Sequence, residues 1–306
     1  MEHLLKMSDL NITEINDILN TADQLKYERS RGIEHKLLKG KTLGLILRKP
    51  STRTRVSFET GMYQLGGHAL VLAEDDIAVG RGGDEQAEDM ARALSRYIDG
   101  ILIRTGEHKD AEDLARYGTV PIINGMTDLA HPCQILSYLM TIREYKGRLD
   151  GLKVGFVGEG NAIMNSLIVG CLKCKMHVAV ACPEGYDPDQ SVIDFAAQVG
   201  HFEMYRDPRG AARAADVVVT NAWLPAGKED EAFERRAAFH IFQVSDDLLR
   251  YAKPDALVFH NMPINRGEEI TASVAEAHSN EIFDAAENLL HVQKAVLIKM
   301  LSDHIE

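Results

Sequence analysis

The sequence predicts an α/β protein with two doubly wound parallel-sheet domains that are linked by two helices. Short apolar runs rich in β-branched residues alternate along the chain with longer amphipathic runs. This alternation is typical of parallel sheets that are covered by helices on both faces. The chain has 306 residues, and a domain usually contains roughly 100–200. Length and alternation together therefore indicate two such units.

The apolar runs give the expected strands. In the first half they are Thr42–Leu47, Ala69–Ala73, Ile101–Arg104 and Val120–Asn124. In the second half they are Val154–Val157, Val178–Ala181, Val217–Thr220 and Leu257–His260.

The segments between the expected strands have a helical period near 3.6 residues. In Val56–Gly66, for example, Phe58, Met62 and Leu65 fall on one helical face. The last amphipathic run, Ala285–Leu301, has no strand after it, so we expect this helix to pack back on the first unit. With a boundary near Gly147–Gly151, these elements predict a first domain of residues 1–147 plus 285–306. The second domain is predicted to span residues 148–284.

The formal net charge of the chain is -12. An acidic chain repels nucleic acid and anionic membranes, so neither is an expected partner. The N-terminal segment MEHLLKMSDL is too polar for a signal peptide, which favours a cytoplasmic protein. Four cysteines are too few for a secreted disulfide framework. We expect Cys133, Cys171, Cys174 and Cys182 to be small buried side chains, with no metal site and no cofactor.

A cluster of cations follows the first expected strand. The run Arg48–Arg55 contains Arg48, Lys49, Arg53 and Arg55 on an otherwise acidic chain. Pro50 and Ser51 are typical of a helix start, because proline lacks an N–H group and serine caps. A helix start exposes free backbone N–H groups at the positive end of the helix dipole. The alternative is an ordinary capped helix with solvated arginines, but the run favours a phosphate or carboxylate site.

The run Ser51-Thr52-Arg53-Thr54-Arg55, followed by Ser57-Phe58-Glu59, resembles the carbamoyl-phosphate motif of the aspartate/ornithine carbamoyltransferase family. His131-Pro132-Cys133-Gln134 matches that family's H-P-x-Q signature, and Arg104 closes a strand where the family has an arginine.

Two further segments extend the resemblance over the whole chain. Asp89–Arg96 resembles the helix after the family's mobile loop. His260-Asn261-Met262-Pro263, followed by Arg266-Gly267-Glu268-Glu269, is similar to the H-C-L-P…R-G-E-E motif of the ornithine branch. Five motifs in the family's order make the resemblance specific.

The resemblance implies the first domain binds carbamoyl phosphate and the second binds an amino substrate. Ser51, Thr52, Arg53 and Thr54 would hold the phosphate, while Arg104, His131 and Gln134 would surround the carbamoyl end. The carbonyl of Met262 would accept a hydrogen bond from the carbamoyl NH2 group. The expected catalytic residues are Arg53, Thr54, Arg104, His131 and Gln134. Donors from Thr54, Arg104 and His131 would stabilise negative charge on the carbonyl oxygen.

The sequence departs from the ornithine pattern mainly on the second-substrate side. The family's G-x-G-N-N run is Gly158–Ala162 here, so Asn161 is retained and Ala162 replaces the second asparagine. The ornithine loop D-x-W-x-S-M-G is Asn221–Gly227, and Asn261 replaces the H-C-L-P cysteine. The expected second-substrate residues are Asn161, Ala162, Asn221, Pro225, Ala226 and Asn261. A family arginine is Leu289 here, which puts some carbamoyl-phosphate affinity in question.

The departures favour an acceptor amine other than ornithine. Replacing aspartate by Asn221 removes the charge that would attract an ammonium group. The two asparagines at 221 and 261 offer neutral donor–acceptor pairs that suit an amide, carbonyl or hydroxyl. The alternatives are a plain ornithine carbamoyltransferase, or a catalytically silent relative that binds carbamoyl phosphate.

A glycine-rich segment, Gly80–Gln86, matches the family loop that reaches a neighbouring subunit's active site in a trimer. The resemblance therefore implies a homotrimer in which Arg81, Glu85 or Gln86 completes the adjacent site.

A nicotinamide dehydrogenase is the rival enzyme class. Gly158-x-Gly160 follows an expected strand, and Glu184 lies where a ribose-binding acid would fall. The third glycine position is Ile163, however, and G-x-G alone is a weak signal.

Overall fold

The computed structural model describes residues 1–49, 51–72, 87–225 and 227–302. The chain divides into two compact units, Met1–Met140 with Asn288–Glu306 and Thr141–Glu287. The divisions fall inside α5 (Pro132–Lys146) and α12 (Ser279–Leu301). These two helices therefore carry the chain from one unit to the other.

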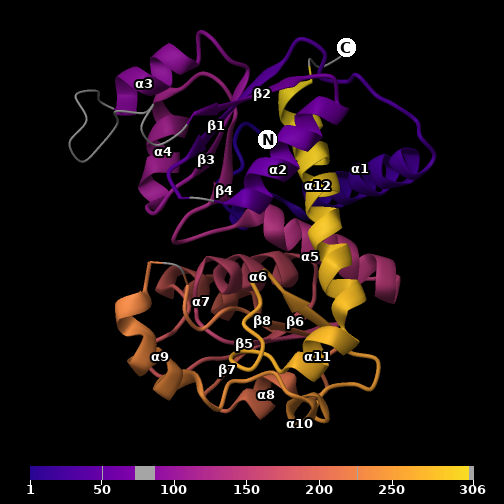
Figure 1. Cartoon of the computed structure of the whole chain (residues 1–306), viewed down its shortest axis with the longest axis vertical. Coiled ribbons are helices and arrows are strands. Elements are labelled where there is room, and N and C mark those ends of the chain that lie inside the picture. Colours follow the sequence, from indigo (N-terminus) through magenta and orange to yellow (C-terminus); the bar gives the residue numbers. More distant parts are fainter. Residues whose placement is uncertain (50, 73–86, 226, 303–306) are drawn as a thin grey trace. The chain divides into compact units, whose positions relative to one another are not determined.

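The first unit contains a parallel sheet with the strand order β2-β1-β3-β4. Helices α3 and α4 lie on one side of this sheet, and α1 and α2 lie on the other (Figure 1). The strands are β1 (Thr42–Leu47), β2 (His68–Leu72), β3 (Gly100–Arg104) and β4 (Ile122–Met126). The helices are η1 (Met7–Asp9), α1 (Ile12–Ser30), α2 (Thr52–Gln64), α3 (Ala87–Leu94) and α4 (His108–Tyr117).

The second unit contains a parallel sheet with the order β7-β6-β5-β8-β9. Its strands are β5 (Lys153–Val157), β6 (His177–Ala181), β7 (Phe202–Tyr205), β8 (Val217–Thr220) and β9 (Leu257–His260). The helices are α6 (Ala162–Lys173), α7 (Gln190–Val199), α8 (Pro208–Ala212), η3 (Glu229–Glu231), α9 (Ala232–Phe239), α10 (Asp246–Leu249) and α11 (Ala272–Ala277). Helices α6 and α7 lie on one side of the sheet and α8 lies on the other (Figure 1).

The predicted fold class is confirmed, and all the predicted strands are present with small shifts of their ends. One observed strand, β7, was not predicted. It pairs only with β6 at the edge of the sheet, and its four residues alternate little in burial. An edge strand with this much exposure lacks the continuous apolar run that marks the central strands. Ala73, the last residue of one predicted strand, lies outside the described residues.

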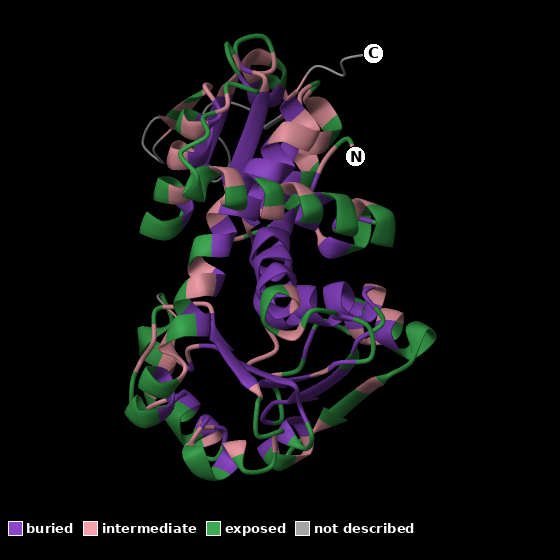
Figure 2. Cartoon of the chain, turned by 90° about the vertical axis from the view of Figure 1, so that its right-hand side faces the viewer, coloured by how far each residue is buried: buried purple, intermediate pink, exposed green. Residues whose placement is uncertain are grey.

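Burial follows the layers of each unit. Strands β5, β6, β8 and β9 of the second unit are almost wholly buried, whereas the outer helices keep exposed faces (Figure 2). The four cysteines are buried, and their thiols are free. Within the described ranges, no helix combines the length and apolar character of a membrane span.

The strand order places one topological switch point in each sheet. In the first sheet the chain winds outward in opposite directions from β1 and β3, and in the second from β5 and β8. Ligands of open α/β sheets bind beyond the carboxyl ends of the strands at such a point. Ligands are therefore expected at the segments that follow β1 and β3 in the first unit, and β5 and β8 in the second.

Candidate functional site

The helix after β1 begins at Ser51, as the sequence predicts, whereas Pro50 lies outside the described residues. Ser51 is the N-cap of α2, and its Oγ accepts a hydrogen bond from the backbone N–H of Thr54 at 3.3 Å. The same Oγ donates to Thr54 Oγ1 at 2.9 Å. Thr54 is buried, whereas Thr52 and Arg53 are exposed at the first turn. The remaining free N–H groups of this turn are thus accompanied by hydroxyl and guanidinium donors.

Arg104, at the end of the neighbouring strand β3, contacts the first turn of α2. It is the last residue of β3, and its Nη1 donates to Thr54 Oγ1 at 3.4 Å and to the carbonyl of Gly125 at 3.2 Å. Burial, and then the positive charge of Arg53, lowers the pKa of Arg104 to about 10. Two guanidinium groups that repel each other in a partly buried site favour the binding of an anion between them.

Two other cations of the run have structural partners. Arg48 Nη1 forms an ion pair with Asp110 Oδ2 at 2.8 Å. Arg55 Nε pairs with Glu59 Oε1 at 3.1 Å on the exposed face of α2. Of the cations in this run, Arg48 and Arg55 therefore form ion pairs with carboxylates, whereas Arg53 lies close enough to Arg104 to lower its pKa.

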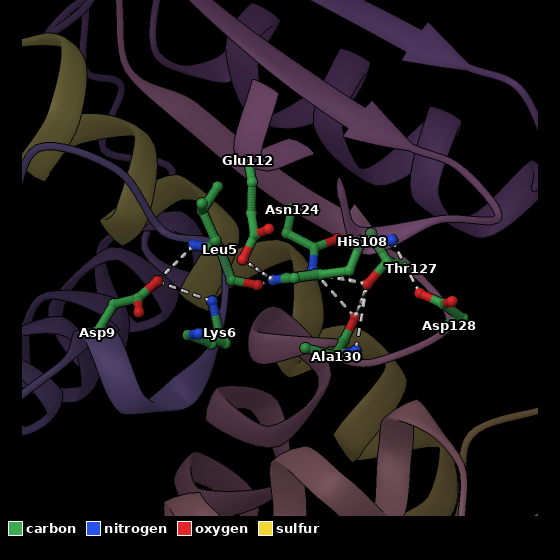
Figure 3. Close-up of polar contacts among 9 residues, drawn as sticks. All are labelled: Leu5, Lys6, Asp9, His108, Glu112, Asn124, Thr127, Asp128 and Ala130. Carbon is green, nitrogen blue, oxygen red and sulfur yellow. Dashed lines mark hydrogen bonds and ion pairs between the residues drawn. The ribbon is translucent and has the colours of Figure 1, made fainter. Parts of the chain in front are cut away.

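The loop that precedes His131 is held by polar contacts of Asn124, Thr127 and Ala130 (Figure 3). Asn124 Nδ2 donates to the carbonyls of Leu5 at 2.7 Å and Ala130 at 3.1 Å. Thr127 N–H donates to Ala130 O at 3.0 Å, and Thr127 Oγ1 accepts from Ala130 N–H at 3.2 Å. These contacts fix the turn directly before His131. Asn124 was not among the predicted site residues, because an asparagine inside a strand carries no sequence signal for what it binds.

His131 is a neutral side chain at ordinary pH. It is 6% exposed, and burial, followed by the charge of Arg104, lowers its pKa to about 3. Gln134 follows in the first turn of α5 and is also buried. A neutral imidazole can offer an N–H donor without being a charged acid.

In the second unit, the turn after β5 leads into α6. Asn161 is the N-cap of α6, and its Oδ1 accepts from the N–H groups of Ile163 at 3.0 Å and Met164 at 3.4 Å. Ala162 is 1% exposed inside α6, so its methyl group is packed within the unit.

Asn221 follows β8 at the switch point of the second sheet. Its Oδ1 accepts from Glu159 N–H at 3.1 Å, and its Nδ2 donates to Glu159 O at 3.2 Å. The side chain is 1% exposed. Both polar atoms of this amide are therefore engaged by the main chain of the turn after β5.

The segment after β9 carries Asn261 and Met262. His260 Nδ1 accepts from Met262 N–H at 2.8 Å, and His260 Nε2 lies 2.9 Å from Glu269 Oε1. Glu269 Oε1 also accepts from Asn265 N–H at 2.6 Å. A fully buried histidine and glutamate thus fix the turn that presents Met262, a role that the sequence motif alone does not reveal.

Two more residues singled out in the sequence lie within the described ranges. Pro225 is half-buried, and Leu289 is 7% exposed on α12. The remaining predicted residues, Arg81, Glu85, Gln86 and Ala226, lie outside the described residues.

The turn at Gly158–Gly160 does not suit a dinucleotide. A Cβ atom at Gly160 would lie 2.2 Å from the backbone of Asp187 and Pro188. In a dinucleotide-binding turn, the corresponding close approach is made by the pyrophosphate. Here the chain itself occupies that space, which argues against the dehydrogenase alternative.

Comparisons with known proteins give matches for both halves of the chain. The family model described as the carbamoyl-P binding domain of aspartate/ornithine carbamoyltransferase matches residues 2–144. The model of the Asp/Orn binding domain matches residues 150–300. Together the two matches span nearly the whole chain.

Individual relatives match over nearly their whole length. The ornithine carbamoyltransferase of Thermococcus kodakarensis is 48% identical over 299 residues, 96% of this chain and 94% of the relative. That of Pyrococcus abyssi is 49% identical over 303 residues, 97% of this chain and 95% of the relative. The solved structure of ornithine carbamoyltransferase from Pyrococcus furiosus superimposes with a TM-score of 0.94 at 48% identity, covering 100% of this chain and 98% of that one.

The prediction of an acceptor other than ornithine is wrong, because these near-full-length relatives are ornithine carbamoyltransferases. It treated the amide of Asn221 as a group that faces the acceptor, whereas that amide binds Glu159. The chain belongs to the aspartate/ornithine carbamoyltransferase family and is a carbamoyltransferase that uses carbamoyl phosphate.

Proposed function

We propose that the chain is an ornithine carbamoyltransferase of amino acid metabolism, located in the cytoplasm. The side-chain amine of L-ornithine attacks the carbonyl carbon of carbamoyl phosphate, the bond to the phosphate oxygen breaks, and citrulline and phosphate form. The observation that carries this proposal is the identity of 48–49% to ornithine carbamoyltransferases over at least 94% of their length.

The phosphate would bind at the start of α2. Free N–H groups, the hydroxyls of Ser51 and Thr52, and the Arg53 guanidinium are donors suited to its oxygens. Neutralising this charge makes the phosphate a better leaving group. The leaving phosphate can accept the proton that the amine loses, so no protein nucleophile is required.

Thr54, Arg104 and His131 would stabilise the negative charge that develops on the carbonyl oxygen. Thr54 Oγ1 accepts from Ser51 and Arg104, which leaves its own O–H free to donate. His131 would donate as a neutral imidazole, since its pKa is lowered to about 3. Gln134 and the carbonyl of Met262 would hold the carbamoyl NH2 group, so that the amine meets an oriented carbonyl.

The acceptor would bind to the second unit, and Asn161, with its side chain fixed as the cap of α6, is its expected ligand. The other predicted second-substrate residues, Ala162, Pro225, Ala226 and Asn261, remain candidates for lining this site. Asn261 Oδ1 is buried and has no hydrogen-bond partner among the described residues, so it can accept one from an ammonium group.

The substrate assignment predicts citrulline formation. With carbamoyl phosphate as donor, kcat/KM for L-ornithine should exceed that for L-lysine, putrescine and L-aspartate by about 100-fold or more, because polar pockets reject mismatched substrates strongly. A colorimetric citrulline assay with phosphate release measured in parallel checks this. Absence of citrulline, or faster turnover of another amine, would refute the proposal. Phosphate release that depends on an added amine would rule out a silent relative, and no such dependence with any amine would indicate one.

Replacing Thr54 by valine should lower kcat/KM by about 10²–10³ while the fold is retained, because one donor to the developing oxyanion is removed without a change of shape. Thr60→Val is the matched control, since it makes the same change on the same helix away from the first turn. Steady-state kinetics with both variants test this. Equal activities of Thr54→Val and Thr60→Val would contradict the role of Thr54.

The lowered pKa of His131 has a consequence for stability. Its folded pKa of about 3 lies below the ordinary value of 6.5, so the unfolded chain binds the extra proton first as pH falls. Below pH 6.5, wild type should lose stability relative to His131→Gln by up to about 1.4 kcal/mol per pH unit. Denaturant unfolding of both proteins between pH 4 and 8 measures this difference. A difference that does not change with pH would show that charged His131 is tolerated.

The proposal includes a homotrimer in which Arg81, Glu85 or Gln86 completes the adjacent active site. Light scattering after size exclusion should give three times the chain mass of 33.9 kDa. A fully active monomer would contradict both the assembly and the shared site.

A further inference from the structure

We propose that Asn221 is a positioning residue for the amino substrate and that it acts on Asn161 through the main chain of Glu159. This inference rests on the proposed function, because Asn161 is the predicted contact to that substrate. It gives a role to the position at which this chain has an amide where the ornithine pattern has a carboxylate.

Asn221 and Asn161 meet at one carbonyl group. The Nδ2 group of Asn221 donates to Glu159 O at 3.2 Å, and the backbone N–H of Asn161 donates to the same oxygen at 3.0 Å. The Oδ1 atom of Asn221 accepts from Glu159 N–H at 3.1 Å. The Asn221 amide thus pairs with Glu159 as a neighbouring strand would, at the point where β5 and β8 have ended. A shift of Glu159 would move Asn161 directly.

The side chain of Asn161 is held in one orientation by its capping role. Its Oδ1 receives the N–H groups of Ile163 and Met164. Its Nδ2 has no partner among the residues that the structure describes, and the residue is only half-buried. This NH2 group is therefore available to donate to an anionic group such as a substrate carboxylate, in a direction set by the turn before it.

The turn is shaped to receive the Asn221 amide. Gly158 has φ +155°, and a Cβ atom there would lie 2.2 Å from Asn221 Oδ1. The close approach of the amide therefore requires glycine at this position.

A buried arginine also binds Glu159, through its carboxylate. Arg235 of α9 is 3% exposed, and its Nη2 donates to Glu159 Oε1 at 2.5 Å while its Nη1 donates to the carbonyl of Trp223 at 2.8 Å. Its Nε donates to Glu231 Oε2 at 2.8 Å. One guanidinium thus links the turn that contains Glu159 to the loop that contains Asn221. The position of Asn221 relative to the turn is therefore set by both hydrogen bonds and charge.

An aspartate at position 221 cannot make the same contact. A carboxylate can accept from Glu159 N–H, but its second oxygen would face Glu159 O without a hydrogen to donate. Glu159 O would keep only the bond from Asn161 N–H, and losing one hydrogen bond while two oxygen atoms face each other is worth about a tenfold change in an equilibrium. If Asn221 were instead a direct ligand of the substrate ammonium, restoring the charge would improve the binding of ornithine. The two roles predict opposite results.

The test is Asn221→Asp, with Asn280→Asp as the control because Asn280 is exposed and the chemical change is identical. We expect KM for L-ornithine to rise about tenfold in Asn221→Asp while KM for carbamoyl phosphate changes by less than about twofold. A KM for ornithine that is unchanged or lower would overturn the inference. If Asn221→Asp does not fold, Asn221→Ser removes the amide without adding charge. It should likewise raise KM for L-ornithine and leave KM for carbamoyl phosphate nearly unchanged.

Amide hydrogen exchange separates this inference from the proposed function. If wild type forms no citrulline from L-ornithine, the proposed function fails by itself. The peptide that spans residues 158–164 should still exchange faster in Asn221→Asp than in wild type or Asn280→Asp. Equal exchange in all three proteins would overturn the positioning role whether or not ornithine is the substrate.

Discussion

The structure depends most on the concentration of positive charge at the carboxyl ends of β1 and β3. Burial, and then the charge of Arg53 at the start of α2, lowers the pKa of the Arg104 guanidinium. Free N–H groups of the helix start point to the same place. The repulsion between these positive charges is unfavourable without an anion. The fold therefore favours the binding of an oxyanion at this place. On a chain with a net charge of -12, this preference is local.

The polar side chains at the switch points of the two units differ in how far protein groups satisfy their hydrogen bonds. In the first unit, the Nε group of Arg104 and the O–H group of Thr54 remain as donors with no partner among the described residues. In the second unit, the switch point is filled by hydrogen bonds within the chain, in which Asn221 and Arg235 both bind Glu159. The switch point of the first unit is thus built from groups that a charged ligand would satisfy, and that of the second unit from a turn whose hydrogen bonds orient a few remaining groups. Both arrangements limit how much must reorder when substrates bind.

Much of the fold was readable from the sequence, because central strands of parallel sheets are continuous apolar runs. The edge strand β7 was not, since Phe202–Tyr205 is mixed in polarity and half exposed. The helix start at Ser51 was also readable, because an N-cap side chain accepts a hydrogen bond from a backbone N–H group only three residues further along the chain. The partners of Asn221 were not, because Glu159 is far away in sequence and the pairing depends on strand order. A comparison with the family pattern assigned Asn221 to the acceptor, and only the contacts across β5 and β8 show what its amide binds.

The central claim is that carbamoyl phosphate binds at the start of α2 beside Arg53, and thermal unfolding with and without this ligand tests it most directly. A ligand at about 100 times its dissociation constant stabilises the folded chain by about 2.7 kcal/mol, which corresponds to a rise of several degrees in Tm. The account predicts such a rise for wild type and a much smaller one for Arg53→Ala at the same ligand concentration. No rise in wild type, or the same rise in Arg53→Ala, would contradict it.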